Sequence, residues 1–318
     1  MSSIGNPLLW CLFLLLVAGL LALDLGIFHR RAHAVGTREA LGWSVFWVAL
    51  SLLFNLGIYL HFGPQKGLEF FTGYLIEKAL SVDNIFVFLV IFRYFAVPAE
   101  YQHRVLFWGI LGAILLRALF IVLGAALLAT FHWVLYVFGA FLVYTGAKLL
   151  RQGEVEVHPE DNPVARFFRR LLPITPGYHG QRFFLRLDGR LLATPLTLVL
   201  VVVEATDVVF AVDSIPAIFG VTLDPFIVFT SNIFAILGLR ALYFVLANVI
   251  DRFHYLSTGL GLVLVFIGTK MLLTDVVHVP IEISLLIIAA LLAGSLALSW
   301  WRPRRGAERG PGPRPPDP

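Results

Sequence analysis

The residues of this 318-residue chain best suited to chemistry are five carboxylates that stand inside long apolar stretches. A charged side chain at the centre of a bilayer costs about 2.5–3.5 kcal/mol, so such residues usually mark an ion path, a proton relay or a substrate site. Carboxylates with nearby hydroxyl and amide oxygens are the ligands that Mg²⁺, Ca²⁺ and Mn²⁺ prefer. The five residues are Glu77, Asp83, Glu204, Asp207 and Asp213.

Four of these carboxylates belong to a repeated pattern. An acid, five further residues, an aspartate, a small polar residue and an isoleucine occupy 77–85 and again 207–215, at an offset of 130 residues. Downstream, Arg117 corresponds to Arg240 and Gly146 to Gly268. Each copy contains three apolar runs, an odd number, so the second copy must lie inverted relative to the first. Inverted repeats build secondary transporters whose substrate site lies near the bilayer midplane.

The composition supplies the helices that must position these residues. Hydrophobic residues make up 59% of the chain and charged residues 14%, whereas soluble domains are about 45–50% apolar and about 25% charged. Each apolar run is close to the ~20 residues that cross a bilayer as a helix. The sequence therefore predicts an all-α, multi-pass membrane protein with about nine transmembrane helices, at 7–28, 41–61, 68–92, 105–129, 132–150, 193–220, 226–248, 254–274 and 280–301.

The distribution of basic residues predicts the orientation. If the N-terminus lies outside, 19 of the 24 Lys and Arg residues fall in inner segments, as the positive-inside rule requires. The C-terminus then lies inside. The net charge of +4 is explained by topology, so no nucleic-acid partner is predicted.

The same runs divide the chain into six parts. They are two N-terminal transmembrane helices (1–67), the first three-helix repeat (68–150), a cytoplasmic connecting loop (151–192), the second, inverted repeat (193–275), a last transmembrane helix (276–301) and a disordered Arg/Pro/Gly-rich cytoplasmic tail (302–318). Within the loop, the residues 183–192 favour a β-hairpin around an Asp-Gly pair.

Helix geometry limits which acids share a face. Residues six apart differ by about 120° and about 9 Å along an ideal helix, so Glu77 and Asp83 would not point the same way. A local break at Pro216 is one remedy in the second copy, because proline frees the carbonyl four residues earlier. Glu204 and Asp207 are three apart and do share a face.

Three segments resemble the TerC/Alx family of integral membrane proteins, which is grouped with the LysE-type transporters. They read LSVDN (80–84), FAVDSIPA (210–217) and TSNIFAILGLR (230–240). The family is associated with tellurium resistance, alkaline-pH response and Mn²⁺ export, and the resemblance spans roughly 20–275. It implies a protein of the bacterial inner (cytoplasmic) membrane.

The resemblance also implies a set of site residues. The metal path would consist of Glu77, Asp83, Asn84, Asp207, Asp213 and Ser214, with Glu204 as a weaker candidate. Lys78, Arg117 and Arg240 would balance the charge. The competing interpretation is that these three basic residues pair with the acids as buried structural bridges. The roles of Asp24, His132 and His254 stay open.

The leading hypothesis is therefore a secondary transporter that exports a divalent cation, with Mn²⁺ as the first candidate and Ca²⁺ and Mg²⁺ as alternatives. Protons are the expected coupling ion, since a carboxylate can alternate between a proton and a metal. No enzymatic activity and no prosthetic group are predicted, and Cys11 is the chain's one cysteine. The alternative is a membrane-embedded interaction protein that assists membrane-protein insertion or a metal or tellurite stress complex. The lipid bilayer is the expected surrounding, and the oligomeric state is left open.

Overall fold

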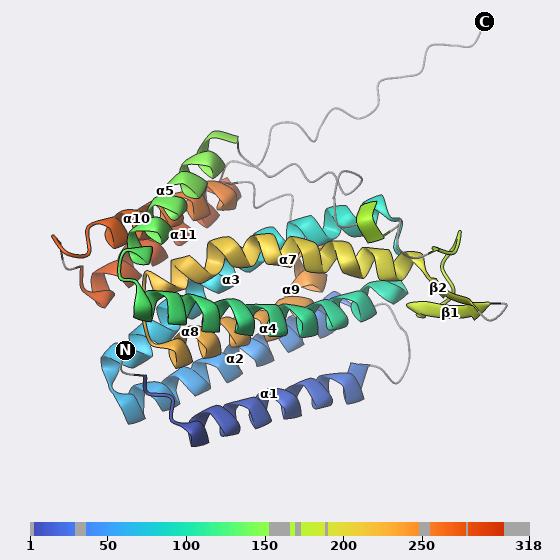
Figure 1. Cartoon of the computed structure of the whole chain (residues 1–318), viewed down its shortest axis with the longest axis horizontal. Helices are drawn as coiled ribbons and strands as arrows, with labels where there is room; N and C mark the ends of the chain where they lie inside the picture. The colour runs from blue at the N-terminus through green and yellow to red at the C-terminus, as the bar shows by residue number, and fades with distance from the viewer. Residues whose placement is uncertain are drawn as a thin grey trace, which may run out of the picture.

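The computed structural model is built almost entirely of long helices (Figure 1) and describes residues 3–28, 36–152, 166–168, 173–187, 190–247, 255–277 and 279–301. The helices of the first half are α1 (Pro7–Phe28), α2 (Thr37–Phe62), α3 (Pro64–Tyr94), α4 (Ala99–Thr130) and α5 (Val134–Gln152). The strands β1 (Phe184–Leu187) and β2 (Arg190–Ala193) follow. The second half contains α7 (Pro195–Phe219), α8 (Pro225–Leu237), α9 (Leu239–Leu246), α10 (Leu256–Leu272) and α11 (Ile281–Trp301).

Every predicted apolar run coincides with a helix, and the seventh run is divided between α8 and α9. Within the described residues, five helices are long and apolar enough to cross a membrane: α2, α4, α5, α7 and α11. The bent pair α8 and α9 makes a sixth if it is one span. The apolar stretches of α1 and α10 are shorter, and α3 carries three charged residues in its middle. The chain is thus an all-helical, multi-pass membrane protein, and nine spans stay a prediction.

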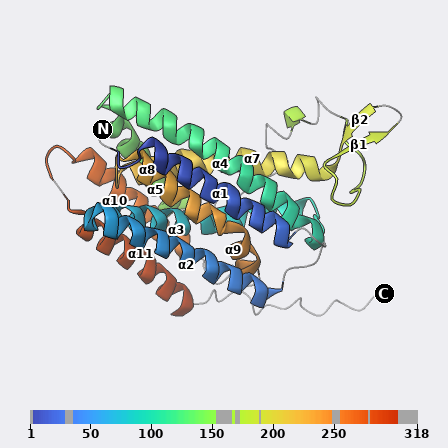
Figure 2. The same cartoon turned by 90° about the horizontal axis from the view of Figure 1, so that it is seen from below.

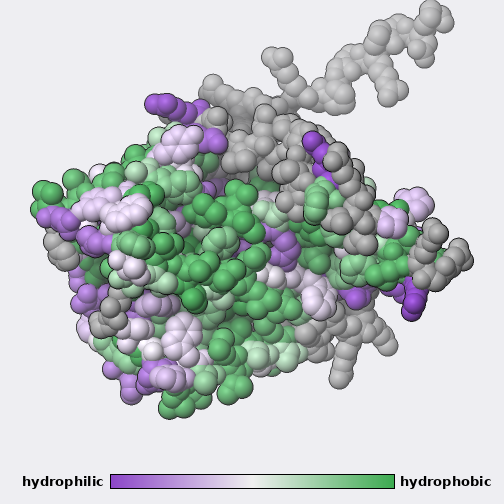
Figure 3. Space-filling view, viewed as in Figure 1, coloured by the Kyte–Doolittle hydropathy of each residue, from purple (hydrophilic) through white to green (hydrophobic). Residues whose placement is uncertain are grey.

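The surface of the molecule is consistent with a lipid environment. Figure 3 shows hydrophobic side chains across the middle of the face that α4 and α7 present, with more hydrophilic ones toward the two ends. On α4 the large apolar side chains Leu115, Leu119 and Val122 are all more than half exposed. Apolar area on this scale marks a surface that contacts something other than water. Hydrocarbon is the natural partner for it.

Prolines and a capping aspartate mark where the central helices begin. Pro64, Pro195 and Pro225 each stand in the first turn of their helix, where the missing N–H would have no intrahelical partner. Asp224 caps α8 by accepting a hydrogen bond from the Phe226 amide at 3.0 Å. These signals fix the starts of α3, α7 and α8.

The interior is formed by helices from both halves of the chain. In it, α8 packs on α3, α4 packs on α7, and α5 packs on α10. The α8 helix is buried on all sides from Phe226 to Leu237, so its polar residues face other helices. The α1 helix joins through Phe13, whose ring lies 5.9 Å from Phe234 and 5.6 Å from Phe54 of α2.

The prediction of a helix break at Pro216 is wrong. The α7 helix continues from Pro195 through Pro216 to Phe219, because the proline stands one turn before the helix ends and removes a single interior hydrogen bond. The break lies instead at Gly238, where α8 and α9 meet at an angle of 41° (Figure 2). The seventh apolar run therefore contains the irregular backbone.

The predicted hairpin in the connecting loop is confirmed. Strands β1 and β2 pair antiparallel, with Phe184 opposite Ala193 and Leu187 opposite Arg190. The predicted tail (302–318), most of the loop between 153 and 172, His254 and the side chain of Asp24 lie outside the described residues.

Candidate functional site

One buried arginine joins acids from the two halves of the chain. Arg117 of α4 is 1% exposed and forms ion pairs with Glu77 of α3 and Asp207 of α7. Its Nη2 and Nε lie 3.1 and 3.4 Å from the two carboxylate oxygens of Asp207, and its Nη1 donates to Glu77 Oε1. A guanidinium presents its donors in a fixed fork that fits such paired oxygens.

Two neutral side chains complete the arrangement. Arg117 Nη1 lies 3.2 Å from Asn232 Oδ1 and 3.4 Å from Ser214 Oγ. The amide of Asn232 also donates to Glu77 Oε2 at 3.2 Å. We refer to Glu77, Arg117, Asp207, Ser214 and Asn232 as the central cluster. Four helices contribute to it, and each of its side chains is buried.

Helix periodicity explains which residues of α7 enter the cluster. Asp207 and Ser214 are seven residues apart, which is nearly two full turns, so they lie on one face. Asp213 is turned by about 100° from Ser214 and faces α5, where it lies beside Thr145 and Lys148. Asn232 is available because α8 is buried on every side.

The other predicted ligands on α3 do not join the central cluster. Asp83 accepts a hydrogen bond from Ser257 at the start of α10, at 3.3 Å. Asn84 is 1% exposed, and its Oδ1 has no hydrogen-bond partner within the described part of the chain. The repeated acids therefore divide into a central pair, Glu77 and Asp207, and two partly buried flanking acids, Asp83 and Asp213.

The flanking acids lie beside the central cluster and not beyond its two ends. Thr222, just after α7, donates to Glu69 near the start of α3 at 2.6 Å, and Gly73 faces Ile218, so the two helices run antiparallel. This register places Asp83 level with Asp207 and Asp213 level with Glu77, each to within about one residue's rise of 1.5 Å. The four acids thus form two levels, each with one central and one flanking carboxylate.

Glu204 lies one turn from Asp207 and faces the same neighbour, as predicted. Its carboxylate packs on Gly112 of α4, where a Cβ would collide with it. Glu204 Oε2 is buried and has no hydrogen-bond partner among the described residues. Gly112 therefore makes room for the Glu204 carboxylate, whose Oε2 accepts no hydrogen bond from the described residues.

The remaining charge-balancing candidates lie outside the central cluster, near the break between α8 and α9. Lys78 Nζ lies 3.3 Å from the carbonyl of Ala235 in the last turn of α8, where a cation complements the helix dipole. A Cβ at Gly238 would lie 2.8 Å from that ammonium, so glycine leaves it space. Arg240, two residues further on, is 5% exposed. Arg117 thus pairs with two of the four repeated acids, Glu77 and Asp207.

No group of three or more His, Cys, Asp or Glu side chains in the described residues is close enough to hold a metal ion. The central cluster has two carboxylates, a hydroxyl and an amide oxygen, which are hard ligands in type. Arg117 now occupies the space between them. The geometry is that of an oxygen site filled by a side-chain cation.

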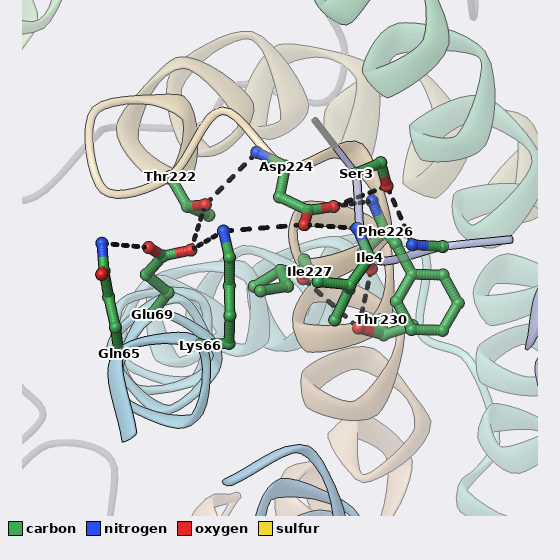
Figure 4. Close-up of polar contacts among 11 residues, drawn as sticks. Ser3, Ile4, Gln65, Lys66, Glu69, Thr222, Asp224, Phe226, Ile227 and Thr230 are labelled. Carbon is green, nitrogen blue, oxygen red and sulfur yellow. Dashed lines mark hydrogen bonds and ion pairs between the residues drawn. The ribbon is translucent and has the colours of Figure 1, made fainter. Parts of the chain in front are cut away.

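A second polar cluster at one end of the bundle was not predicted. Figure 4 shows Glu69 accepting from Gln65, Lys66 and Thr222, while Lys66 also approaches Asp224 at 3.6 Å. We call these five residues the end cluster. Glu69 and Asp224 are both less than 10% exposed, yet they stand at the edges of apolar runs, where charge is ordinary. The sequence signal that could have identified these two acids is their position at the edges of the apolar runs 68–92 and 226–248.

A cavity of about 430 Å³ lies next to the end cluster. Its polar lining includes Glu69, Thr222, Lys270 and Glu282, and its apolar lining includes Phe219. Glu77 stands eight residues beyond Glu69 on α3, roughly 12 Å along the axis. The cavity therefore lies at the end of the bundle where α3 begins and α7 ends.

Replacing Asp224 by alanine should lower the stability of the protein. The substitution removes the α8 cap, the acceptor for Ser3 Oγ at 2.8 Å and the acceptor for the Ile4 amide at 2.9 Å. We expect a loss of about 1–3 kcal/mol, because the buried Phe226 amide is left unpaired and two part-buried donors lose their acceptor. Thermal unfolding of the purified protein in detergent measures it. Asp275→Ala, at an exposed aspartate of the same end, is the control, and an equal shift in the two variants would contradict the role given to Asp224.

Comparison with known proteins identifies the family. The profile of the "Integral membrane protein TerC family" matches residues 62–307. An "Uncharacterized membrane protein" of Myxococcus xanthus is 58% identical over 297 residues, 93% of each chain. The Escherichia coli K12 protein named "Putative membrane-bound redox modulator Alx" is 50% identical over 310 residues, 95% of this chain and 97% of its own length. No solved structure matches the chain. The protein therefore belongs to the integral membrane protein TerC family.

Proposed function

We propose that this protein is a secondary transporter that exports a divalent metal cation, with Mn²⁺ ahead of Ca²⁺ and Mg²⁺, in exchange for protons. The observation that carries the proposal is the central cluster, in which carboxylates from both halves of the chain meet in a fully buried site. Two buried acids are costly within a membrane protein and are typical of an ion pathway. Their hydroxyl and amide neighbours suit a hard divalent cation.

The pairing of central and flanking acids supports a path through the bundle. Asp83 is level with Asp207 and Asp213 is level with Glu77, so a cation leaving the central cluster sideways would meet a further carboxylate at each level. In this proposal Asn84, with its unpartnered carbonyl oxygen, serves beside Asp83. Protons released or taken up by the same carboxylates would couple the movement of metal to a pH gradient. No prosthetic group and no catalytic residue are needed.

An inverted repeat in a nine-span protein is the architecture that we propose for this path. Helix contacts favour it: α4 packs on α7, and the corresponding run of the second copy, α8, packs on α3. The two glycine contacts of the α5–α10 pair are also reciprocal. A Cβ at Gly146 would lie 2.6 Å from the Gly261 carbonyl, and one at Gly268 equally close to that of Gly139. A two-fold axis that relates the two repeats would produce both of these glycine contacts.

We also propose that the N-terminus lies outside and the basic loops inside, in the bacterial inner membrane. The end cluster and the 430 Å³ cavity would then face the outside. Export requires the central cluster to open alternately to the two faces. The six parts of the chain described above keep their boundaries in this proposal.

Two other functions remain to be set against transport. One is an interaction protein that acts through the basic 151–192 segment, which would leave the buried acids dispensable. The other follows the name of the Escherichia coli relative, a redox modulator. This chain has a single cysteine, Cys11, exposed on α1, so it has no dithiol pair of its own. Cys11→Ser should therefore leave transport unchanged.

Uptake of Mn²⁺ into inside-out vesicles tests the transport proposal. Vesicles that contain the protein should accumulate Mn²⁺ when a pH gradient is imposed and much less without it. Asp83→Asn and Asp213→Asn should each reduce this uptake by about tenfold or more, since each removes a charged ligand from the path. Parallel assays with Ca²⁺ and Mg²⁺ measure the preference.

The matched control replaces residues 151–190 by a neutral linker. Transport should then persist, because the four repeated acids are intact. Full activity in both aspartate variants together with loss of activity in the linker variant would reject the transporter and favour the interaction protein.

A further inference from the structure

Arg117 sits where a transported cation would have to bind. Its donors reach five oxygen atoms: one of Glu77, both of Asp207, Ser214 Oγ and Asn232 Oδ1. The nitrogen-to-oxygen distances outside the Glu77 contact are 3.1–3.4 Å. A divalent ion needs six or more oxygens at about 2.0–2.6 Å, so the shell must contract around the metal. The guanidinium fills the space that this contraction requires.

Charge makes simultaneous occupancy unfavourable. If both carboxylates are ionised, Glu77, Asp207 and Arg117 together carry one net negative charge. A divalent cation added beside the guanidinium would leave a net positive charge in a buried site. Exchanging the guanidinium for the metal leaves the site neutral. Like charges a few ångströms apart repel strongly where the effective dielectric constant is low.

The structure also offers a second position for the guanidinium. Glu204 lies one turn from Asp207 on the face of α7 that contacts α4, the helix that carries Arg117. Its Oε2 is buried and has no partner among the described residues, and the missing side chain at Gly112 lets the carboxylate lie directly against α4. A flexible arginine released by Glu77 and Asp207 would find an acceptor there without leaving the interface between α4 and α7.

We infer that Arg117 and the transported cation occupy the central oxygen site in turn, and that Glu204 receives the guanidinium when the metal is bound. Arg117 then acts as a tethered substitute for the substrate: it neutralises the buried acids of the empty carrier and lets that carrier return. This inference rests on the proposed function and adds to it a reason why the metal-free transporter is stable. A positioning role, rather than a catalytic one, is assigned to both residues.

Equilibrium binding of radiolabelled Mn²⁺ to the purified full chain tests the inference. Arg117→Gln should bind Mn²⁺ about tenfold or more tightly than the native chain, because a competing charge is gone. In proteoliposomes the same variant should keep Mn²⁺–Mn²⁺ exchange but lose net Mn²⁺ export by about tenfold or more, because the empty site returns with two uncompensated carboxylates. Arg104→Gln, at the start of the same helix, should change neither.

A double-variant measurement distinguishes an Arg117 that exchanges with the metal from an Arg117 that only holds the helices together. Glu204→Gln should weaken Mn²⁺ binding in the native background, where the displaced guanidinium needs an acceptor, and should have no effect in the Arg117→Gln background. If Arg117 only held the helices together, the effect of Glu204→Gln on Mn²⁺ binding would not depend on whether Arg117 is present. Equal effects of Glu204→Gln in both backgrounds would overturn the inference.

The experiments distinguish a variant that fails to fold from a failure of the inference and from a failure of the proposed function. If Arg117→Gln is not monodisperse, Arg117→Lys replaces it, and we expect tighter Mn²⁺ binding than in the native chain, since an ammonium reaches fewer of the five oxygens. Unchanged or weaker binding by whichever variant is monodisperse overturns the inference while leaving the proposed transporter intact. A native chain that neither binds nor exchanges Mn²⁺, Ca²⁺ or Mg²⁺ overturns the proposed function itself.

Discussion

Replacing Glu77 by glutamine or Asp207 by asparagine is expected to abolish divalent-cation export and to destabilise the protein. Each residue is less than 5% exposed and bonds directly to Arg117. Each substitution removes a charge-assisted hydrogen bond to Arg117, which keeps the other carboxylate as its partner, so we expect a loss of about 1.5–3 kcal/mol. Transport should fall by more than about tenfold, the loss seen when even an outer partner of a metal site is removed. Vesicle uptake and thermal unfolding measure the two effects.

A compensating variant separates the effect on transport from the effect on stability. In Glu77→Gln combined with Asp207→Asn and Arg117→Gln, no charge of the central cluster remains, so much of the lost stability should return. Transport should not return, because both carboxylates of the central cluster are still missing. Glu100→Gln, at an exposed acid at the start of α4, serves as the control. Export near the native level in a stable Glu77→Gln variant would remove the central cluster from the path.

Substituting Gly146 by leucine is expected to separate α5 from α10. A Cβ at this position would lie 2.6 Å from the Gly261 carbonyl and 2.9 Å from the Val265 amide nitrogen. Backbone atoms cannot yield as a side chain can, so the two helices must move apart. Close packing of small residues is the main source of helix association in a membrane, where lipid tails are as apolar as leucine. We expect a loss of about 3 kcal/mol, at the upper end of overpacking costs.

The same substitution should reduce transport through the flanking acids. Asp83 and Asp213 are held by residues of α10 and α5, so separating these helices releases both contacts. Thermal unfolding and vesicle uptake of the purified variant measure the two losses. Gly294→Leu on α11 is a matched control, because no atom lies within 4 Å of the Cβ that it would add. Similar losses in the two leucine variants would show that the effect is not one of helix contact.

The sequence predicted the class of protein and the course of its helices. Apolar runs of about 20 residues can satisfy their backbone groups in a bilayer only as helices, so their positions follow from composition alone. Helix periodicity also predicted that Glu77 and Asp83 face different neighbours and that Glu204 and Asp207 share one. Both expectations agree with the contacts to Arg117, Ser257 and α4. These two expectations could be made from the sequence because they depend only on the rotation per residue within one helix.

Partners between helices could not be predicted in this way. Nothing in the local pattern distinguishes Arg117 from Lys78 as the group that pairs with the repeated acids, since both are basic residues in apolar runs. Asn232 was one of several polar residues that could bond between helices. The break at Gly238 was also unexpected, because Pro216 is the stronger local signal. Each depends on which residues meet after the chain has folded.

The amino-acid sequence alone thus determined the membrane class, the helical segments and the rare acids within them. Tertiary structure decided that Glu77 and Asp207 share one guanidinium, that Asp83 and Asp213 lie apart from it, and that Glu69 and Asp224 are buried. The physical reason is the range of the interactions. Helix formation and burial in lipid are set by neighbouring residues, whereas the ion pairs join residues 40 and 90 positions apart. Those pairs form because α3 and α4 both pack on α7 and α8, which no local pattern specifies.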